Sequence, residues 1–324
     1  MIMKMMNKFL VLVLLFIFCF SSLQSSEKDK GKSSTRVEYE VGYYPPPTPS
    51  MSVFCGEIID LSNYYLRERY DRELLSFLYW HSQIFLMIKR ANKFFPVIEA
   101  ILIEEGVPTD FKYLALIESL FDQRAVSSAK AAGVWQILAE TAKEYGLEVT
   151  EDVDERYNLE KSTVLACKYL KRTYEQTKNW ATAAASYNAG RGRVLSQIEI
   201  QKTSDYFDML FSEETNRYIF RILVAKQIFS EPQKYGFYLK KEDLYYFVDY
   251  DIIEVNHAIP NLTDFAKSHG INYQILKDAN PWLRTNKLTN KDKKTYQIKI
   301  PKKNALKFDS KKIQVYQKNW VINP

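Results

Sequence analysis

Apolar residues recur at three- and four-residue spacing almost without interruption over residues 61–230. This spacing places the apolar side chains on one face of a helix, so the stretch is typical of amphipathic helices. It is too long for one helix, because glycine interrupts it at Gly106, Gly146 and Gly190. The pattern therefore predicts several helices that pack their apolar faces into a shared core.

The interruptions divide this stretch into separate predicted helices. After Gly106, Thr109 or Asp110 can accept hydrogen bonds from free backbone N–H groups and so cap the next helix. A run of small residues at 181–186 suits a helix whose neighbours approach closely, although high helix propensity alone explains it equally well. The predicted helices are 111–121, 131–145, 161–177, 180–187 and 214–229.

The character of the sequence changes after Pro232. Residues 245–255 are rich in Tyr, Val and Ile, and residues 295–300 alternate between polar and apolar, which is typical of strands. Two short helical patterns lie between them, at 262–268 and 273–280. The sequence therefore predicts a compact strand-helix-helix-strand module over residues 240–303, followed by a basic C-terminal tail over residues 304–324.

The first residues are typical of a secretory signal. Lys4 and Lys8 precede an apolar run at 9–20, which is shorter than the roughly 20 residues that a membrane-spanning helix needs. We expect a signal peptide over residues 1–26 and a flexible, proline-rich linker over residues 27–50. Cys19 raises the alternative of a lipidated anchor, which the bulky Phe18 before it disfavours. The expected location is the periplasm or cell envelope, with outer-membrane association left open.

Positive charge is concentrated near the C-terminal end. The chain has a formal net charge of +6, and from Lys287 to Lys312 there are ten Lys and two Asp. Such a region can meet a polyanion, and for an exported protein envelope polymers or lipid headgroups suit this role better than nucleic acid, which we do not expect. A solvated face that keeps the protein soluble explains the lysines equally well.

Cysteine and histidine give little support for crosslinks or metal chemistry. Cys55 and Cys167 remain once the signal is set aside; whether they pair is left open, and we expect the core rather than a crosslink to stabilise the fold. The histidines, His81, His257 and His269, are scattered without the spacing of metal ligands. No metal ion or other cofactor is therefore expected.

Glu118 is an unusual carboxyl because apolar residues surround it. On a helix its neighbours three and four positions away include Leu114, Ala115 and Phe121. A carboxyl on such a surface loses hydration, which raises its pKa and favours the protonated form that a general acid needs near neutral pH. The alternative is a structural glutamate at a helix end, half solvated or paired with Lys or Arg.

The residues after Glu118 carry a family resemblance. The motifs, in order, are Ser127, Ala131-Ala132-Gly133-Val134-Trp135-Gln136, Tyr145-Gly146, Asp154-Glu155-Arg156, Tyr187-Asn188-Ala189-Gly190, and Glu214-Thr215 with Tyr218. With this order and spacing, residues 95–230 resemble the lytic transglycosylases of the lysozyme-like superfamily, in particular the membrane-bound transglycosylase D type. The later segment, with Asn280-Pro281-Trp282-Leu283 and residues 296–301, resembles a divergent LysM module.

The resemblance implies an α+β fold that is mainly α. A lysozyme-like all-helical catalytic domain with an N-terminal helical extension would occupy residues 51–235, and the small LysM-like module would follow it. The implied reaction cleaves the β-1,4 bond between N-acetylmuramic acid and N-acetylglucosamine in peptidoglycan. Glu118 would protonate the departing oxygen and then act as base toward the C6 hydroxyl of the same muramoyl residue, which closes a 1,6-anhydro ring. No water attacks, so no second carboxylate is needed.

The same resemblance implies four substrate-binding residues, each with a structural alternative. Tyr187 should approach Glu118 and hydrogen-bond near the reacting sugar, or else be a core ring with a satisfied hydroxyl. Gln136 matches a glutamine that binds acetamido or hydroxyl groups. Ser127 matches a groove serine or caps a loop, and Asn188 contacts the ligand or braces a turn.

Some positions depart from the family pattern. Lys130 stands where glycine is usual, and Gln123 and Ala139 stand where prolines are usual. If position 130 needs a positive φ, a lysine there is strained. Trp135 is expected to pack in the core, and residues 154–156 to form a structural ion-pair cluster.

Two other functions remain open at this point. A hydrolytic muramidase on the same fold would need a base for water at about 6.5–9.5 Å from the acid. A catalytically silent peptidoglycan-binding protein would tolerate the loop departures, although the presence of Glu118 argues against it. In each case the expected partners are peptidoglycan glycan strands, the expected state is a monomer, and peripheral contact with the envelope membrane is left open.

Overall fold

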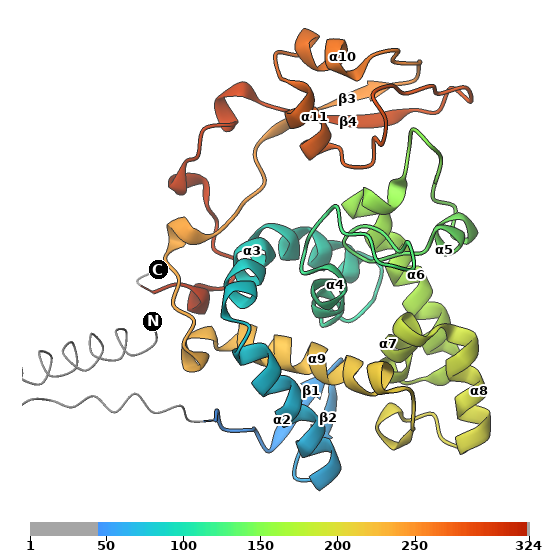
Figure 1. Cartoon of the computed structure of the whole chain (residues 1–324), viewed down its shortest axis with the longest axis vertical. Coiled ribbons are helices and arrows are strands. Elements are labelled where there is room, and N and C mark those ends of the chain that lie inside the picture. The colour runs from blue at the N-terminus through green and yellow to red at the C-terminus, as the bar shows by residue number, and fades with distance from the viewer. Residues whose placement is uncertain (1–44, 323–324) are drawn as a thin grey trace, which may run out of the picture. The chain divides into compact units, whose positions relative to one another are not determined.

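The computed structural model describes residues 45–322 (Figure 1). The expected signal peptide, Cys19 and most of the expected linker lie outside the described residues. Of the linker, residues 45–50 are described, and there the Thr48 hydroxyl donates to Asp71 at 2.7 Å while the Ser50 carbonyl accepts from Leu61. In the described part of the chain, no helix combines the length and apolar character that a membrane span requires.

The described chain begins with a β-hairpin that the sequence did not predict. β1 (Met51–Phe54) pairs antiparallel with β2 (Glu57–Asp60), and Phe54 and Ile59 point into the core. Two long helices follow, α2 (Tyr64–Leu78) and α3 (His81–Glu104). Most of these two helices lies before residue 95, where the expected family resemblance begins.

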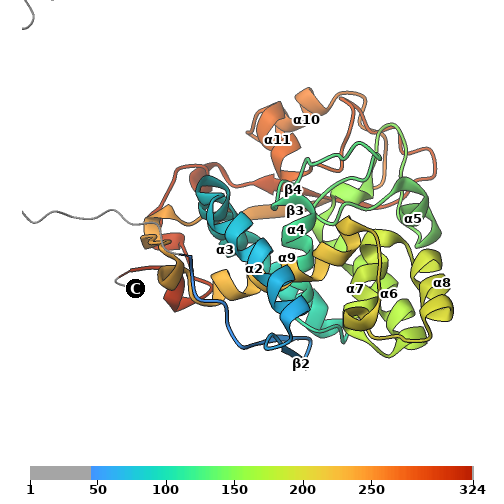
Figure 2. The ribbon, with the colours of Figure 1, turned by 60° about the horizontal axis from the view of Figure 1, so that its bottom comes forward.

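The central helix of this domain is α9, which is buried along most of its length. α9 lies against α2, α4 and α7 (Figure 1 and Figure 2). The helices predicted at 111–121, 161–177, 180–187 and 214–229 are confirmed, with ends shifted by a few residues. Their bounds are α4 (Phe111–Ser119), α5 (Ala139–Glu144), α6 (Leu159–Thr177), α7 (Trp180–Ala189), α8 (Arg191–Gln201) and α9 (Glu213–Ser230).

The helix predicted over residues 131–145 is wrong for its first half. Only α5 is helical, and residues 125–138 form a loop in which Ala132 makes antiparallel bridges to Val126 and Ile137. The backbone is left-handed at Gly133 and Gln136, with φ of 78° and 47°, which a continuous right-handed helix excludes. The apolar residues of this segment are therefore buried in a loop that packs into the core, and they do not lie along one face of a helix.

The capping role predicted for Asp110 is also wrong. α4 begins directly after Asp110, but the Asp110 side chain makes no capping hydrogen bond. Its carboxylate instead accepts from the backbone N–H of Cys55 and from the Lys226 ammonium, each at 2.7 Å. Asp110 therefore ties the N-terminal hairpin to α9.

The C-terminal module has the predicted strand-helix-helix-strand order. β3 (Tyr250–Val255) pairs antiparallel with β4 (Tyr296–Pro301), and α10 (Leu262–Ser268) and α11 (Tyr273–Ala279) lie between them in the chain. Leu262, Leu276 and Ile298 are fully buried in a second, smaller core, to which the module contributes most of the residues. This confirms the fold class, which is mainly helical with a small mixed module.

A short segment before α6 holds the module against the helical domain. The Asp152 carboxylate accepts from the Thr285 hydroxyl at 2.6 Å and from the Thr289 backbone N–H at 3.0 Å. Val153 forms a β-bridge with Leu283. Since Asp152 is buried, these bonds are protected from competing water.

The predicted basic tail returns to the helical domain. Its lysines at 307, 311, 312 and 318 are exposed, but Trp320 is fully buried against the rings of Phe95 and Phe229. The indole Nε1 of Trp320 donates to the Phe229 carbonyl at 2.7 Å. The end of the tail is therefore part of the core.

The two described cysteines do not bridge. Cys55 and Cys167 are both free thiols, and Cys167 is fully buried. Burial raises the pKa of each thiol, to about 12 for Cys167. Both side chains therefore stay neutral and act as small core residues.

Candidate active site

Glu118 lies in the last turn of α4, a helix that is buried almost throughout. Leu114, Ala115 and Leu116 are fully buried, whereas Glu118 is half-buried. The helix ends because Leu120 and Phe121 both adopt left-handed backbone angles, with φ of 50° and 54°. Glu118 forms no ion pair with any described residue. A carboxyl is thus held at the edge of the core with no ion-pair partner among the residues that the structure describes.

Tyr218, on α9, is the hydrogen-bond partner of Glu118. Its hydroxyl donates to Glu118 Oε1, and the Tyr218 side chain is only 3% exposed. Tyr218 belongs to the family pattern, but the resemblance implied no role for it. The available signal was its position one turn after Glu214-Thr215, which places its hydroxyl on the inner face of the helix.

The environment raises the pKa of Glu118 to about 7. Desolvation by burial is the main cause, and the nearby charge of Glu214 acts in the same direction. The Tyr218 hydrogen bond and the Arg221 charge lower the pKa, but they do not offset the burial. At neutral pH this carboxyl is therefore poised to donate a proton and to take one back.

Tyr187 comes close to Glu118 but makes its hydrogen bond elsewhere. The Glu118 charge is one of the causes that raise the pKa of Tyr187, with burial as the largest. The Tyr187 hydroxyl donates to the backbone carbonyl of Trp135 at 2.7 Å. The hydroxyl proton of Tyr187 is thus engaged by the loop before α5, and its contact with the reacting sugar stays a prediction.

Asn188, the next residue on α7, joins that helix to α9. Its amide nitrogen donates to Glu214 at 3.3 Å, and its amide oxygen accepts from the Thr215 hydroxyl at 2.8 Å. These bonds support the bracing alternative considered for Asn188. They fix α7, which carries Tyr187, relative to α9, which carries Tyr218.

Ser127 and Gln136 organise the loop at 125–138. The Ser127 hydroxyl accepts from the Ala131 backbone N–H at 3.1 Å, as a loop cap does. The Gln136 amide donates to the carbonyls of Ala125 and Gly133 at 3.2 and 2.9 Å. The structure therefore brings both residues into one loop with structural hydrogen bonds; their contact with substrate stays a prediction.

Arg156 also stabilises the loop at 125–138. Its guanidinium donates to the carbonyls of Lys130 and Ile137, at 2.9 and 3.1 Å, and pairs with Asp154 at 2.7 Å. The ion-pair cluster predicted at residues 154–156 is thus a structural one. Lys130 has a φ of 63°, the strained geometry anticipated for a lysine at a glycine position.

The loop is also tied directly to the helix of the candidate acid. Ser119 donates its hydroxyl proton to the Val134 carbonyl at 2.8 Å, and the Trp135 indole donates to the Thr163 hydroxyl on α6 at 2.8 Å. Trp135 is fully buried, as expected for a packing residue. The site therefore consists of the Glu118 carboxyl, the Tyr218 hydroxyl beside it and the loop at 125–138. These groups are positioned by α4, α6, α7 and α9.

Comparison with known proteins gives matches over both parts of the chain. Residues 95–210 match the family described as Transglycosylase SLT domain, and residues 251–304 match the family described as Soluble lytic transglycosylase C-terminal LysM-like domain. The membrane-bound lytic murein transglycosylases D of Escherichia coli strain K12 and of Escherichia coli O6:H1 are each 28% identical over 205 residues. The match is 61% of this chain and 44% of each relative.

A solved structure of an inactive mutant of the lytic transglycosylase Slt from Pseudomonas aeruginosa is 22% identical. It matches with a TM-score of 0.35 over 44% of this chain and 24% of that chain. The chain thus spans less than half the length of the curated relatives that it matches.

Proposed function

We propose that this chain, which carries a transglycosylase SLT domain followed by a LysM-like domain, is a peptidoglycan lytic transglycosylase. One observation carries the proposal: a half-buried glutamate that forms no ion pair within residues 45–322 and whose pKa of about 7 suits both halves of an acid–base cycle. A structural glutamate in an ion pair would have its pKa lowered instead.

The proposed reaction uses Glu118 twice. Protonated Glu118 gives its proton to the bridging oxygen as the bond from this oxygen to C1 of N-acetylmuramic acid breaks. The resulting carboxylate takes the proton of the C6 hydroxyl on the same sugar, whose oxygen then bonds to C1. The products are an N-acetylglucosamine end and a 1,6-anhydromuramoyl end, and Glu118 is protonated again.

Tyr218 suits the role of a positioning residue in this cycle. Its hydroxyl donates to one carboxylate oxygen and leaves the other available for the sugar. Because the hydrogen bond is stronger to the ionised carboxylate, it also stabilises the intermediate stage in which Glu118 has lost its proton. Ser127, Gln136, Tyr187 and Asn188 stay proposed substrate-binding residues.

A hydrolytic muramidase is the second candidate, and Glu214 is the observation that favours it. Glu214 is exposed on α9, and its charge raises the pKa of Glu118, so it is the second carboxylate that such a reaction would use. Mass spectrometry of digested sacculi separates the two reactions. We expect anhydro-muropeptides without reducing ends; reducing ends would instead establish hydrolysis, and binding without release would establish a silent binding protein.

The cell envelope is the proposed place of action, because peptidoglycan is located there. Two of the relatives are named as membrane-bound, and we extend peripheral envelope association to this chain on that basis. The LysM-like module is proposed to hold glycan. The monomeric state and the export signal stay predictions.

The Tyr218→Phe substitution should shift the pH dependence of activity. Activity requires protonated Glu118 in the free enzyme, so kcat/KM should fall as pH rises through about 7. Without the Tyr218 hydrogen bond, which lowers this pKa, the alkaline limb should move to higher pH. The measurement is a pH profile of kcat/KM on soluble glycan strands.

Tyr187→Phe is the matched control for that profile. It removes a hydroxyl that donates to a backbone carbonyl and not to Glu118. Its alkaline limb should therefore stay at the wild-type position. Equal shifts in both variants, or none in Tyr218→Phe, would contradict the role given to Tyr218.

A further inference from the structure

We propose that a hollow between α3 and the LysM-like module binds the carboxylate-bearing peptide stem of peptidoglycan, an inference that rests on the proposed function. The cavity has a volume of about 400 Å³, within the range of small-molecule pockets, about 300–1,000 Å³. Its walls come from α3, the start of α6, the segment before β3, α11 and β4. None of the residues assigned above to the reaction line it.

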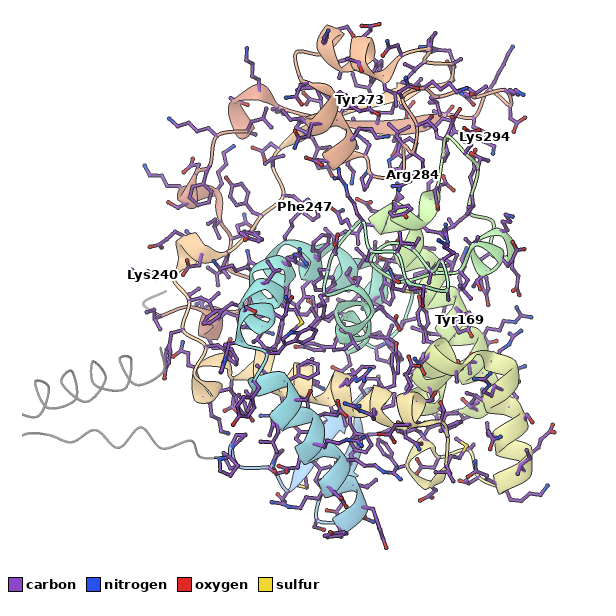
Figure 3. All side chains as sticks on the ribbon, in the orientation of Figure 1. Tyr169, Lys240, Phe247, Tyr273, Arg284 and Lys294 are labelled. Atoms are coloured by element: carbon purple, nitrogen blue, oxygen red, sulfur yellow. The ribbon has the colours of Figure 1, made fainter. Side chains whose placement is uncertain are left out.

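Aromatic rings form a large part of the wall. Tyr157, Tyr246, Phe247, Tyr250 and Trp282 all line the cavity. Phe247 lies on the segment that connects the helical domain to β3 (Figure 3), and it is 36% exposed. Such rings give flat apolar contact to a ligand that has apolar atoms of its own.

Most charged groups in the wall already have partners. Lys299 pairs with Glu160, and Asp278 pairs with Arg124. Lys93, on α3, is the exception: its ammonium makes no ion pair or hydrogen bond within residues 45–322. The hollow therefore presents one unmatched positive charge among aromatic rings.

The surroundings of Lys93 favour an anionic guest. Its Nζ lies 4.4 Å from the ring centroid of Phe247 and 5.3 Å from that of Phe94. Burial lowers the pKa of Lys93, and Asp278 raises it without offsetting the burial. A carboxylate bound beside this ammonium would supply the missing partner.

A second hollow connects the first to the segment that follows the helix of Glu118. This second hollow, of about 570 Å³, shares Lys93 and Gln123 with the first and reaches Phe121 and Arg124. These last residues belong to the loop that begins where the helix of Glu118 ends. Because the polymer would be cut at Glu118, a side branch of the same polymer is the occupant that suits this hollow.

Among the parts of peptidoglycan, the peptide stem has the matching chemistry. A stem ends in a free carboxylate and carries methyl and methylene groups that suit the aromatic wall. The N-acetylated sugars of the strand are neutral except where a muramoyl lactyl group lacks its peptide. The unmatched charge therefore selects the stem over the glycan.

The test is calorimetric titration of the full chain with a synthetic stem tetrapeptide. The matched probes are the same peptide with amidated carboxyls and a tetramer of N-acetylglucosamine. Lys93→Gln should weaken binding of the acidic peptide by about tenfold, the value of one charge-assisted hydrogen bond. Lys93→Arg should retain binding, and Lys168→Gln, an exposed lysine on α6, should leave it unchanged.

Three results would overturn the assignment. They are equal affinity of Lys93→Gln and wild type for the acidic peptide, equal binding of the amidated peptide, and Lys93-dependent binding of the sugar tetramer. Phe247→Ala, a change at an exposed ring, should also weaken the peptide and guards against a folding defect in the Lys93 variants. Thermal unfolding of each variant checks the fold.

The titration separates this inference from the proposed function. The free peptide holds no glycosidic bond, so Glu118→Gln should bind it as the wild type does. Cleavage of sacculi without Lys93-dependent peptide binding overturns only the stem site. Lys93-dependent peptide binding together with cleavage that survives Glu118→Gln overturns only the proposed reaction.

Discussion

Glu118→Gln is expected to lower the rate of peptidoglycan cleavage by on the order of 10²–10⁴-fold, the usual contribution of general acid–base catalysis. The amide has nearly the shape of the carboxyl and can still accept the Tyr218 hydrogen bond. It can neither protonate the bridging oxygen nor take the proton of the C6 hydroxyl. The measurement is the release of soluble muropeptides from purified sacculi.

A matched control and a stability measurement accompany this variant. Glu175→Gln changes an exposed glutamate on α6 and should cleave at the wild-type rate. Because the folded pKa of Glu118 lies above its unfolded value, wild-type stability is fully present below pH 4.5 and falls as pH rises toward 7. Glu118→Gln lacks this loss, so its melting temperature relative to wild type should rise between pH 5 and pH 8. Unaltered cleavage by Glu118→Gln would falsify the proposed mechanism.

Gly133→Ala is expected to cost about 3 kcal/mol or more of folding stability. A Cβ at this position would lie 2.2 Å from the backbone oxygen of Arg156, and the φ of 78° is unfavourable for any side chain that has a Cβ. The clash is with backbone, so no rotamer change relieves it. Denaturant unfolding measures the loss.

Gly192→Ala is the control for this substitution. Gly192 lies in α8, and an added Cβ would meet no atom within 4 Å. Alanine has the higher helix propensity, so stability should stay equal or increase by up to about 1 kcal/mol. Similar stability of the two variants would show that the close approach of Gly133 to Arg156 is not needed for folding.

Gly133→Ala should also impair cleavage more than its stability loss explains. The loop that contains Gly133 also contains Ser127 and Gln136, and its Val134 carbonyl accepts from Ser119, next to Glu118. Displacing the loop therefore moves groups around the acid. Activity measured at a temperature where the variant stays folded isolates this effect.

The sequence predicted the elements whose apolar spacing is long and regular. α6 and α9 each extend over several turns with a buried face, so their positions follow from periodicity alone. The module was predicted because its strands and helices are separated by clear turn residues. Glu118 stood out as a carboxyl among apolar neighbours, and the family resemblance then implied its role as the acid.

The loop at 125–138 was misread because its burial does not come from helix geometry. Its apolar residues are buried because Arg156 and Gln136 bind backbone carbonyls that a helix would have paired internally. Arg156 is distant in sequence from the carbonyls that it binds, and Gln136 binds its carbonyls from a position with left-handed backbone. Local spacing contains no information about either.

The choice between Tyr187 and Tyr218 depended on packing that a sequence does not reveal. Both tyrosines lie near the acid, and the resemblance favoured Tyr187 as its neighbour. The bonds of Asn188 to Glu214 and Thr215 fix the rotation of α7 against α9, and in that arrangement Tyr218 faces the carboxyl. Which tyrosine bonds to Glu118 therefore depends on the tertiary packing of helices that are distant in sequence.

The burial of Trp320 means that the C-terminal segment belongs to the core of the helical domain. After α9 the chain leaves the helical core and forms the LysM-like module. It then returns, and the Trp320 indole packs in the same core. The module is therefore an insertion that is connected to the helical domain at both ends. A truncated version ending at residue 304, where the family match stops, would keep the whole module but remove the Trp320 indole from the core of the helical domain. Any shortened form intended to work must therefore extend through Val321.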